Sequence, residues 1–178
     1  MGAGKSSVGR ALGQRLNWPF EDLDDRIESR EGRSIAEIFR DSGESAFRSA
    51  EHSALREVLD ELRSGAARIV ALGGGAFVQR RNAGLLKAFA APVVFLDAPV
   101  EELWRRCHIQ AGQIGANRPL LGSGERFREL YRARRGGYLR ASLRIETGGR
   151  TVDAVAAEIA ETLDLTRIPR RREPGDLK

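Results

Sequence analysis

Two patterns of hydrophobic and polar positions run along the chain. Between Lys5 and Leu16, apolar side chains recur every three or four residues, which predicts a helix with one buried face. The same period predicts helices at residues 35–43, 44–63, 79–89, 99–107, 125–139 and 152–163. Short apolar runs predict strands at Trp18–Phe20, Arg68–Leu72, Val93–Asp97 and Leu143–Thr147. Because strands alternate with helices, we expect an α/β protein with a buried parallel sheet.

Particular residues mark where the elements begin and end. Ser34 and Glu37 have the spacing of a capping box, and Thr151 is expected to cap the last helix. Residues 109–124 hold four glycines and little apolar periodicity, which predicts a mobile surface loop. The basic residues 166–178 are expected to form a disordered tail after one folded domain at residues 1–165.

Composition narrows the class of protein. The chain has 178 residues, of which 41% are apolar, enough for one domain with its own core. One cysteine and two histidines make neither a disulfide nor a zinc site with thiolate and imidazole ligands, so a bound ion is expected to take oxygen ligands. No apolar run approaches the ~20 residues of a membrane span and no secretory signal is visible, so we expect a cytoplasmic protein.

The net charge of +5 favours an anionic ligand. Arginines alternate with acids between Glu21 and Arg63, and aromatic residues make up only 6% of the chain. This pattern argues against a nucleic-acid-binding surface, because such a surface needs a stripe of basic side chains with aromatic side chains that stack on the bases. A small anionic molecule is the better match.

The first residues carry the most specific motif. Gly2, Ala3, Gly4, Lys5 and Ser6 form the second half of the phosphate-binding pattern G-x-x-x-x-G-K-[ST], directly before a predicted helix. The alternative is a glycine-rich turn with a chance Gly-Lys-Ser. The first glycine of the pattern, and the strand that feeds it, would both lie before Met1. We therefore expect the natural chain to begin upstream of Met1.

Further motifs follow in a fixed order. They are Asp22-Leu-Asp24-Asp25, Gly43-Glu44-Ser-Ala-Phe47-Arg48, Leu72-Gly73-Gly74-Gly75, Arg118-Pro-Leu-Leu121, and Arg134 four residues before Tyr138. Together with the Gly-Lys-Ser start, this ordered set resembles the shikimate kinases, from the first residues to about Leu163. The resemblance implies a P-loop fold of three αβα layers, with a central parallel sheet of five strands and a mobile lid. The first and central strand of that sheet would be missing from this chain.

The resemblance also implies roles for particular residues. On the substrate side, Asp24 would bind the ring hydroxyls of shikimate and accept the proton, Arg48 and Arg134 would clamp the carboxylate, and the turn Gly73–Gly75 would approach the ring. On the nucleotide side, ATP would contact Gly2–Ser7, Arg106, Arg118 and Arg150, with Lys5 at the β- and γ-phosphates and Arg118 closing with the lid. One Mg²⁺ would enter with ATP, bound directly by Ser6 and through water by Asp22.

Other interpretations stay open at this stage. Asp22, Asp24 and Asp25 also fit acids at the start of a helix, and Arg48 and Arg134 fit surface partners of Glu44 and Glu129. The glycines at 73–75 also fit a plain turn after a strand. For the whole chain, the alternatives to a monomeric shikimate kinase are a kinase of another polyol acid such as gluconate, and a non-catalytic sensor of the same fold.

Overall fold

The computed structural model describes residues 2–64, 67–114 and 123–165, in which four strands lie among seven helices. The strands are β1 (Phe20–Asp22), β2 (Ile69–Ala71), β3 (Val94–Asp97) and β4 (Leu143–Glu146). The helices are α1 (Lys5–Leu16), α2 (Leu23–Glu31), α3 (Ile35–Ser64), α4 (Arg80–Ala88), α5 (Val100–Ile114), α6 (Gly124–Tyr138) and α7 (Val152–Thr162). The predicted α/β class is confirmed.

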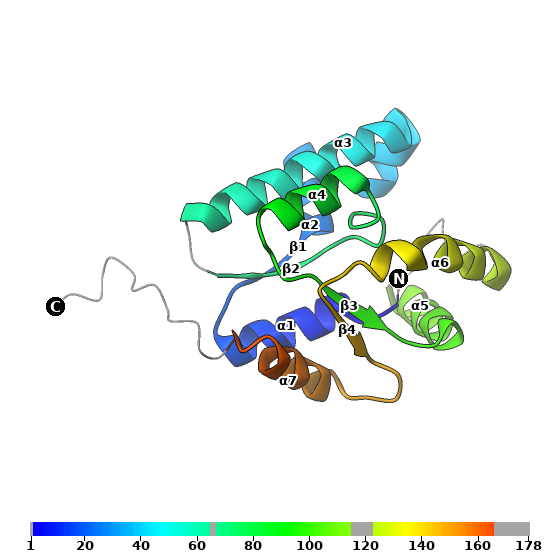
Figure 1. Cartoon of the computed structure of the whole chain (residues 1–178). Coiled ribbons are helices and arrows are strands. Elements are labelled where there is room, and N and C mark those ends of the chain that lie inside the picture. The colour runs from blue at the N-terminus through cyan, green and yellow to red at the C-terminus, as the bar shows by residue number, and fades with distance from the viewer. Residues whose placement is uncertain (1, 65–66, 115–122, 166–178) are drawn as a thin grey trace.

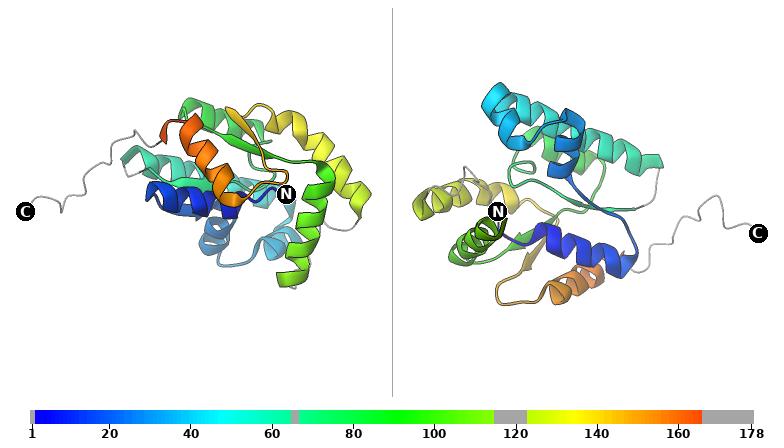
Figure 2. Two further views of the ribbon diagram at one scale, coloured as in Figure 1. Left: turned by 90° about the horizontal axis from the view of Figure 1, so that it is seen from below. Right: turned by 180° about the vertical axis from the view of Figure 1, so that it is seen from behind.

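Helices cover the strands from two sides (Figure 1). Helices α2, α3 and α4 lie on one side, while α1 and α7 pack together on the other. The remaining helices, α5 and α6, contact each other beside the N-terminus, as the views from below and behind also show (Figure 2). None of the described helices is long and apolar enough to cross a bilayer.

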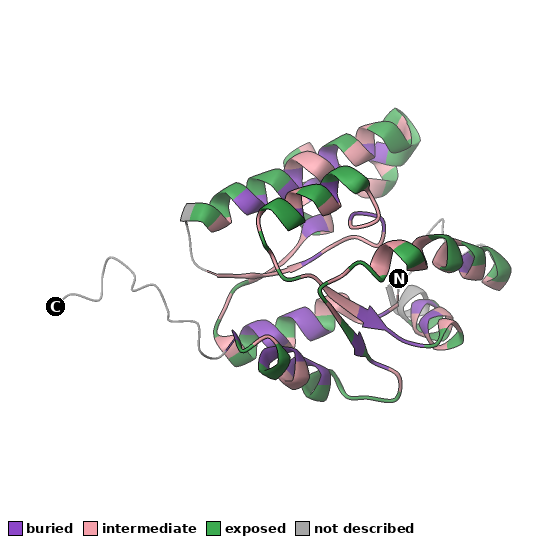
Figure 3. Ribbon diagram, viewed as in Figure 1, coloured by how far each residue is buried: buried purple, intermediate pink, exposed green. Residues whose placement is uncertain are grey.

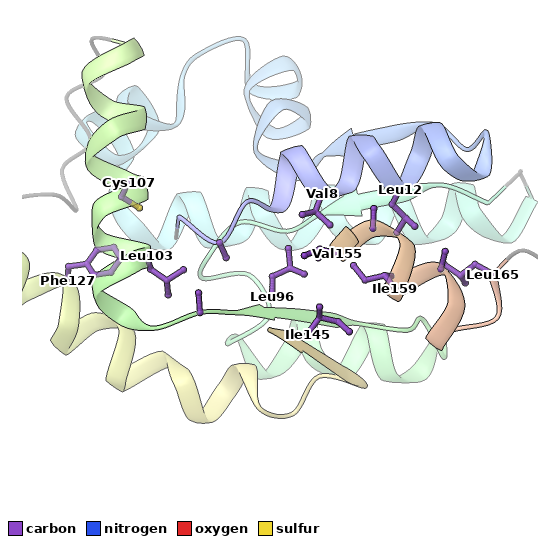
Figure 4. Packing of buried hydrophobic residues seen from close by; sticks show 14 residues of the cluster. Val8, Leu12, Leu96, Leu103, Cys107, Phe127, Ile145, Val155, Ile159 and Leu165 are labelled. Atoms are coloured by element: carbon purple, nitrogen blue, oxygen red, sulfur yellow. The ribbon is translucent and has the colours of Figure 1, made fainter. Parts of the chain in front are cut away.

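The buried apolar side chains form two clusters, and the purple stretches of the ribbon mark them along the chain (Figure 3). One cluster joins α1, α5 and α7 to β3 and β4, with Leu12, Leu96 and Ile159 among its members (Figure 4). The other joins α2, α3 and α4 through residues such as Ile27 and Leu55. Strand β2 contributes side chains to both clusters, so the clusters do not divide by strand pair.

The strands form two separate parallel sheets. Strand β1 pairs with β2, Phe20 opposite Ile69, and β3 pairs with β4, Val94 opposite Leu143. Among the described residues no strand joins the two sheets. Between them lies a cavity of about 440 Å³, lined mainly by apolar side chains of both sheets and of α1, α3 and α7. One edge of β2 and one edge of β3 therefore have no strand partner in the described part of the chain.

Most predicted helix ends are confirmed. The backbone N–H of Ser34 donates to the Glu37 carboxylate at 2.8 Å, and the Glu37 N–H donates to the Ser34 hydroxyl at 3.3 Å, which completes the capping box. The Thr151 hydroxyl accepts from the N–H of Ala154 at 3.2 Å. Gly43 interrupts α3 with a φ of 76°, where a break between two helices is predicted.

Three expectations about elements are wrong. The first strand begins at Phe20 rather than Trp18, because the N–H of Trp18 donates to the carbonyl of Gly13 and still belongs to the end of α1. The structure contains α2, a helix that the hydrophobic pattern does not predict. Helix α5 continues to Ile114, so the predicted loop does not begin at residue 109. Residues 115–122 and the predicted tail lie outside the described residues.

Candidate active site

The phosphate-binding pattern lies at the N-terminus of α1. Gly2 has a φ of +64°, and a Cβ atom added to it would lie 2.4 Å from the carbonyl oxygen of Leu103, so only glycine fits there. Gly4 precedes the helix, and Lys5 to Ser7 form its first turn. The first N–H groups of a helix lack partners within it and carry a partial positive charge. This end of α1 is therefore suited to bind an anion such as a phosphate.

The two residues expected at a metal ion lie in contact. The hydroxyl of Ser6 donates to Oδ2 of Asp22 at 2.8 Å, and Oδ1 of Asp22 accepts from the N–H of Asp24 at 3.1 Å. Among the described residues no three His, Cys, Asp or Glu side chains gather into a metal-binding group. A hydroxyl and one carboxylate beside a phosphate site are instead the hard oxygen ligands that suit Mg²⁺ bound together with a nucleotide.

Asp24 lies in the first turn of α2, half-buried. Burial raises the pKa of its carboxyl, the negative charge of Asp22 raises it further, and the positive charge of Lys5 opposes both. Asp22 caps the same helix, so these acids do stand at a helix start, as one interpretation expected. The shifted pKa shows that Asp24 also lies close to Lys5 and Asp22.

Arg48 is held by two carboxylates from α3. Its guanidinium binds Glu44 at 3.1 Å and Glu51 at 3.0 Å. The Glu44 side chain is 68% exposed, whereas that of Glu51 is 1% exposed and that of Arg48 is 15% exposed. The expected partnership with Glu44 is present, but the second partner makes Arg48 part of a buried group. Burial raises the pKa of the Glu51 carboxyl, and the charge of Arg48 lowers it.

The glycine turn after β2 touches both groups. A Cβ atom added to Gly73 would lie 2.6 Å from Oδ1 of Asp24, and one added to Gly75 would lie 2.6 Å from Nη1 of Arg48. Larger residues would therefore displace the carboxylate or the guanidinium. The turn does more than connect β2 to α4, because its glycines let the backbone lie against both charged side chains.

Arg134 reaches the same place from α6. Its positive charge lowers the pKa of Glu51 and that of Tyr138, so it lies near both. The Tyr138 hydroxyl donates to the carbonyl of Gly74 at 2.5 Å. Arg48 therefore binds Glu51 directly, and the charge of Arg134, from a separate helix, acts on the same carboxyl.

The residues expected at adenine come from two segments, Arg106 from α5 and Arg150 from the loop after β4. Arg106 donates to the hydroxyl of Thr147 at 3.2 Å and to its carbonyl at 2.8 Å, and it pairs with Glu102 on its own helix. Arg150 donates to the carbonyl of Glu146 at 3.1 Å and pairs with Glu158. Both arginines therefore contact residues 146–147. Arg118 lies outside the described residues.

Two residues of the site were not predicted. Glu51 follows Arg48 by three positions, a spacing that places them on one helix face and that the sequence could have revealed. Asn82, fully buried, donates from Nδ2 to the carbonyl of Ala76 at 3.1 Å, and its Oδ1 lies 2.7 Å from Nδ1 of His52. No sequence pattern links Asn82 to a turn six residues earlier.

The chain was compared with known proteins. A family model described as shikimate kinase matches residues 1–164. The "Shikimate kinase" of Geobacter metallireducens is 44% identical over 167 residues, covering 92% of this chain and 88% of the relative. The one from Geobacter sulfurreducens is 42% identical, covering 90% and 84%.

A solved structure extends the likeness to the fold. The shikimate kinase from Acinetobacter baumannii, solved in complex with shikimate, superposes with a TM-score of 0.79 at 32% identity, covering 95% of this chain and 91% of that one. Family model, relatives and fold agree over nearly the whole length, and the residues quoted for the resemblance come together in space wherever they are described. The chain belongs to the shikimate kinase family.

Proposed function

We propose that the chain transfers the γ-phosphoryl group of ATP to the 3-hydroxyl of shikimate, giving shikimate 3-phosphate and ADP. One observation carries the proposal. A half-buried group of one carboxylate and two arginines, from Asp24, Arg48 and Arg134, lies around a glycine turn next to the phosphate-binding end of α1. Such a group is matched to a small molecule that bears both hydroxyls and a carboxylate.

The nucleotide would bind along the start of α1. Backbone N–H groups of Gly2–Ser7 would bind the phosphates, Lys5 would reach the β- and γ-phosphates, and Arg106 and Arg150 would flank adenine. Ser6 would hold one Mg²⁺ directly and Asp22 would hold it through water. Bound there with ATP, the ion would neutralise negative charge on the phosphate oxygens in the transition state of the transfer.

Asp24 would act as the base. As the 3-hydroxyl oxygen of shikimate forms its bond to the γ-phosphorus, the bond from that phosphorus to the β-phosphate oxygen breaks, and ADP leaves. The hydroxyl proton goes to the carboxylate of Asp24, whose raised pKa makes it a better acceptor than an exposed aspartate. No covalent enzyme intermediate is needed, because acceptor and donor are held in line.

Two arginines would hold the carboxylate of shikimate, and a third would close the site. Arg48 and Arg134 offer bidentate donors to the carboxylate, and Glu51 fixes the guanidinium of Arg48. We assign Arg118 to the lid, where it would screen the phosphates as the lid excludes water. The domain would be residues 1–165, followed by a basic tail, and the protein would act as a monomer in the cytoplasm.

We also propose that the cavity between the two sheets takes a fifth, central parallel strand. Its lining is apolar and extends along β2 and β3, whose facing edges lack strand partners among the described residues. A strand leading into Gly2 would complete one continuous sheet between two helical layers.

The strand is tested by an N-terminal extension. An apolar β-branched segment of about five or six residues, followed by glycine and one further residue, would be fused before Met1 to complete the phosphate-binding pattern, and a Gly-Ser segment of equal length serves as the control. We expect only the apolar extension to raise Tm and to slow amide exchange in β2 and β3. Equal Tm for both extensions would contradict the strand.

The proposed reaction is tested by ADP release in the presence of Mg²⁺ and ATP, with shikimate, with gluconate or with neither. We expect release that depends on shikimate alone. Release with gluconate would instead identify a kinase of another polyol acid. Shikimate binding by calorimetry without ADP release would identify a sensor.

A further inference from the structure

Tyr138 links two parts of the proposed shikimate site. It lies at the end of α6, and its hydroxyl donates to the carbonyl of Gly74 at 2.5 Å. Its ring packs against Phe95 of β3, with the ring centroids 5.2 Å apart. Burial raises the pKa of the hydroxyl, so the group stays protonated and keeps donating at neutral and mildly alkaline pH.

The same residue stands one helical turn after Arg134. Side chains four positions apart lie on one helix face, and the positive charge of Arg134 acts on the Tyr138 hydroxyl by lowering its pKa. The phenol therefore joins the arginine of the carboxylate clamp to the backbone of the glycine turn. The sequence separation between Tyr138 and Gly74 is 64 residues, so this link is tertiary.

The turn is also fixed at its other end. The side-chain amide of Asn82 donates to the carbonyl of Ala76 at 3.1 Å. Ala76 lies two residues after Gly74, whose carbonyl accepts from the Tyr138 hydroxyl. Between these two points lies Gly75, whose backbone packs against the Arg48 guanidinium, and just before them lies Gly73, against Asp24. A shift of the turn at Gly74 would therefore move the surface that faces the base and the clamp.

We propose that Tyr138 is a positioning residue for shikimate, which sets the glycine turn and Arg134 at a fixed distance from each other; the inference rests on the proposed function. Tyr138 acts through these groups rather than on the reacting atoms. Its loss affects the binding of shikimate, whereas the phosphate-binding end of α1 has no part in the link.

The test is Tyr138→Phe, which removes one hydroxyl and keeps the ring. The same helix offers a matched control in Tyr131→Phe, because the Tyr131 hydroxyl donates at 2.6 Å to Asp97, at the end of β3, and not to the turn. Both changes delete one tertiary hydrogen bond, so both are expected to lower Tm. KM for shikimate, KM for ATP and kcat are then measured for wild type and both variants.

For Tyr138→Phe we expect KM for shikimate to rise about three- to tenfold, the effect of one lost hydrogen bond, with KM for ATP unchanged. For Tyr131→Phe we expect both KM values to stay within twofold of wild type. A Tyr138→Phe enzyme with wild-type KM for shikimate, or a rise shared by Tyr131→Phe, would overturn the positioning role. If the wild-type protein itself shows no shikimate-dependent ADP release, the proposed function fails and the inference fails with it.

Discussion

The two halves of the site are built differently. On the shikimate side, charged side chains are buried against one another, with Glu51 1% exposed and Arg48 15% exposed. On the nucleotide side, the proposed phosphate site combines backbone N–H groups at the start of α1 with the Lys5 side chain, and Arg150 lies exposed on its loop. One half is thus assembled from side chains of three helices around a glycine turn, and the other from one helix end, Arg106 of α5 and a loop.

This difference predicts which half of the site is more sensitive to substitution. A buried charge that loses its partner is strongly destabilised, because neither water nor another group replaces the lost contact. Backbone N–H groups at a helix end depend little on any one side chain. Substitutions on the shikimate side should therefore have the larger effects, and they should act on shikimate more than on ATP.

The largest effect is expected for Asp24→Asn. The amide cannot accept the proton, so kcat should fall by roughly 10²–10⁴-fold, the usual contribution of a general base. ATP binding should persist, because the nucleotide contacts lie on α1. Steady-state kinetics and an ATP titration by calorimetry check both statements, and normal turnover would remove Asp24 from its role.

The raised pKa of Asp24 gives this prediction a second readout. A carboxyl whose pKa is higher in the folded protein than in the unfolded chain binds its proton more tightly when folded. Its ionisation therefore destabilises the fold as pH rises above the ordinary value of 3.8. At neutral pH, Asp24→Asn should melt at or above the wild-type Tm. The acid limb of the wild-type kcat/KM profile, which reports the free enzyme, should also lie above the ordinary aspartate range.

The next largest effect is expected for Arg134→Ala. Loss of one arm of the carboxylate clamp should weaken shikimate binding by about 2–5 kcal/mol, the range for truncating one partner of a buried charged pair. Affinity for ATP should not change. Calorimetric titrations of shikimate and ATP measure both, and unchanged shikimate affinity would count against the clamp.

Glu51→Gln should have a smaller effect. The variant keeps the shape of the side chain but removes the buried charge that holds Arg48, so KM for shikimate should rise about tenfold, in line with a hydrogen bond to a charged group. Glu44→Gln is the matched control, since that carboxylate binds the same guanidinium but is 68% exposed. Its KM should stay within twofold of wild type. Equal effects of the two changes would show that burial of Glu51 does not matter.

The smallest effect is expected for Arg106→Ala. Removing the contacts to Thr147 should raise KM for ATP by about three- to fivefold and leave KM for shikimate unchanged, because the loop backbone remains. Initial rates at varied ATP and at varied shikimate separate the two constants. A larger effect on shikimate than on ATP would reverse the assignment of the two halves.

Local patterns in the sequence predicted most of the fold. Helix α1, the capping box at Ser34 and the cap at Thr151 depend on residues within one or two turns, and the structure confirms them. The end of α5 was misplaced because the glycines after residue 108 indicated a loop, although Gly112 is flanked by Ala and Gln, which favour helices. The shift of β1 reflects a helix cap at Trp18 that apolarity alone does not reveal.

Within the site, motifs in sequence order predicted the side chains but not their partners. Asp24, Arg48 and Arg134 come from recognised patterns, and the structure brings them to one place. The bonds from Tyr138 to Gly74 and from Asn82 to Ala76 depend on how β2, α4 and α6 pack. Contacts of this kind follow from tertiary structure, and no single sequence determines them by spacing.

The most direct test of the account is to identify the product. The protein is incubated with ATP, Mg²⁺ and shikimate, and phosphorus NMR follows the formation of a phosphate monoester of shikimate together with ADP. We predict shikimate 3-phosphate in a one-to-one ratio with ADP, and neither product when shikimate is omitted. ADP without the phosphate ester, or no reaction by folded protein, would contradict the account.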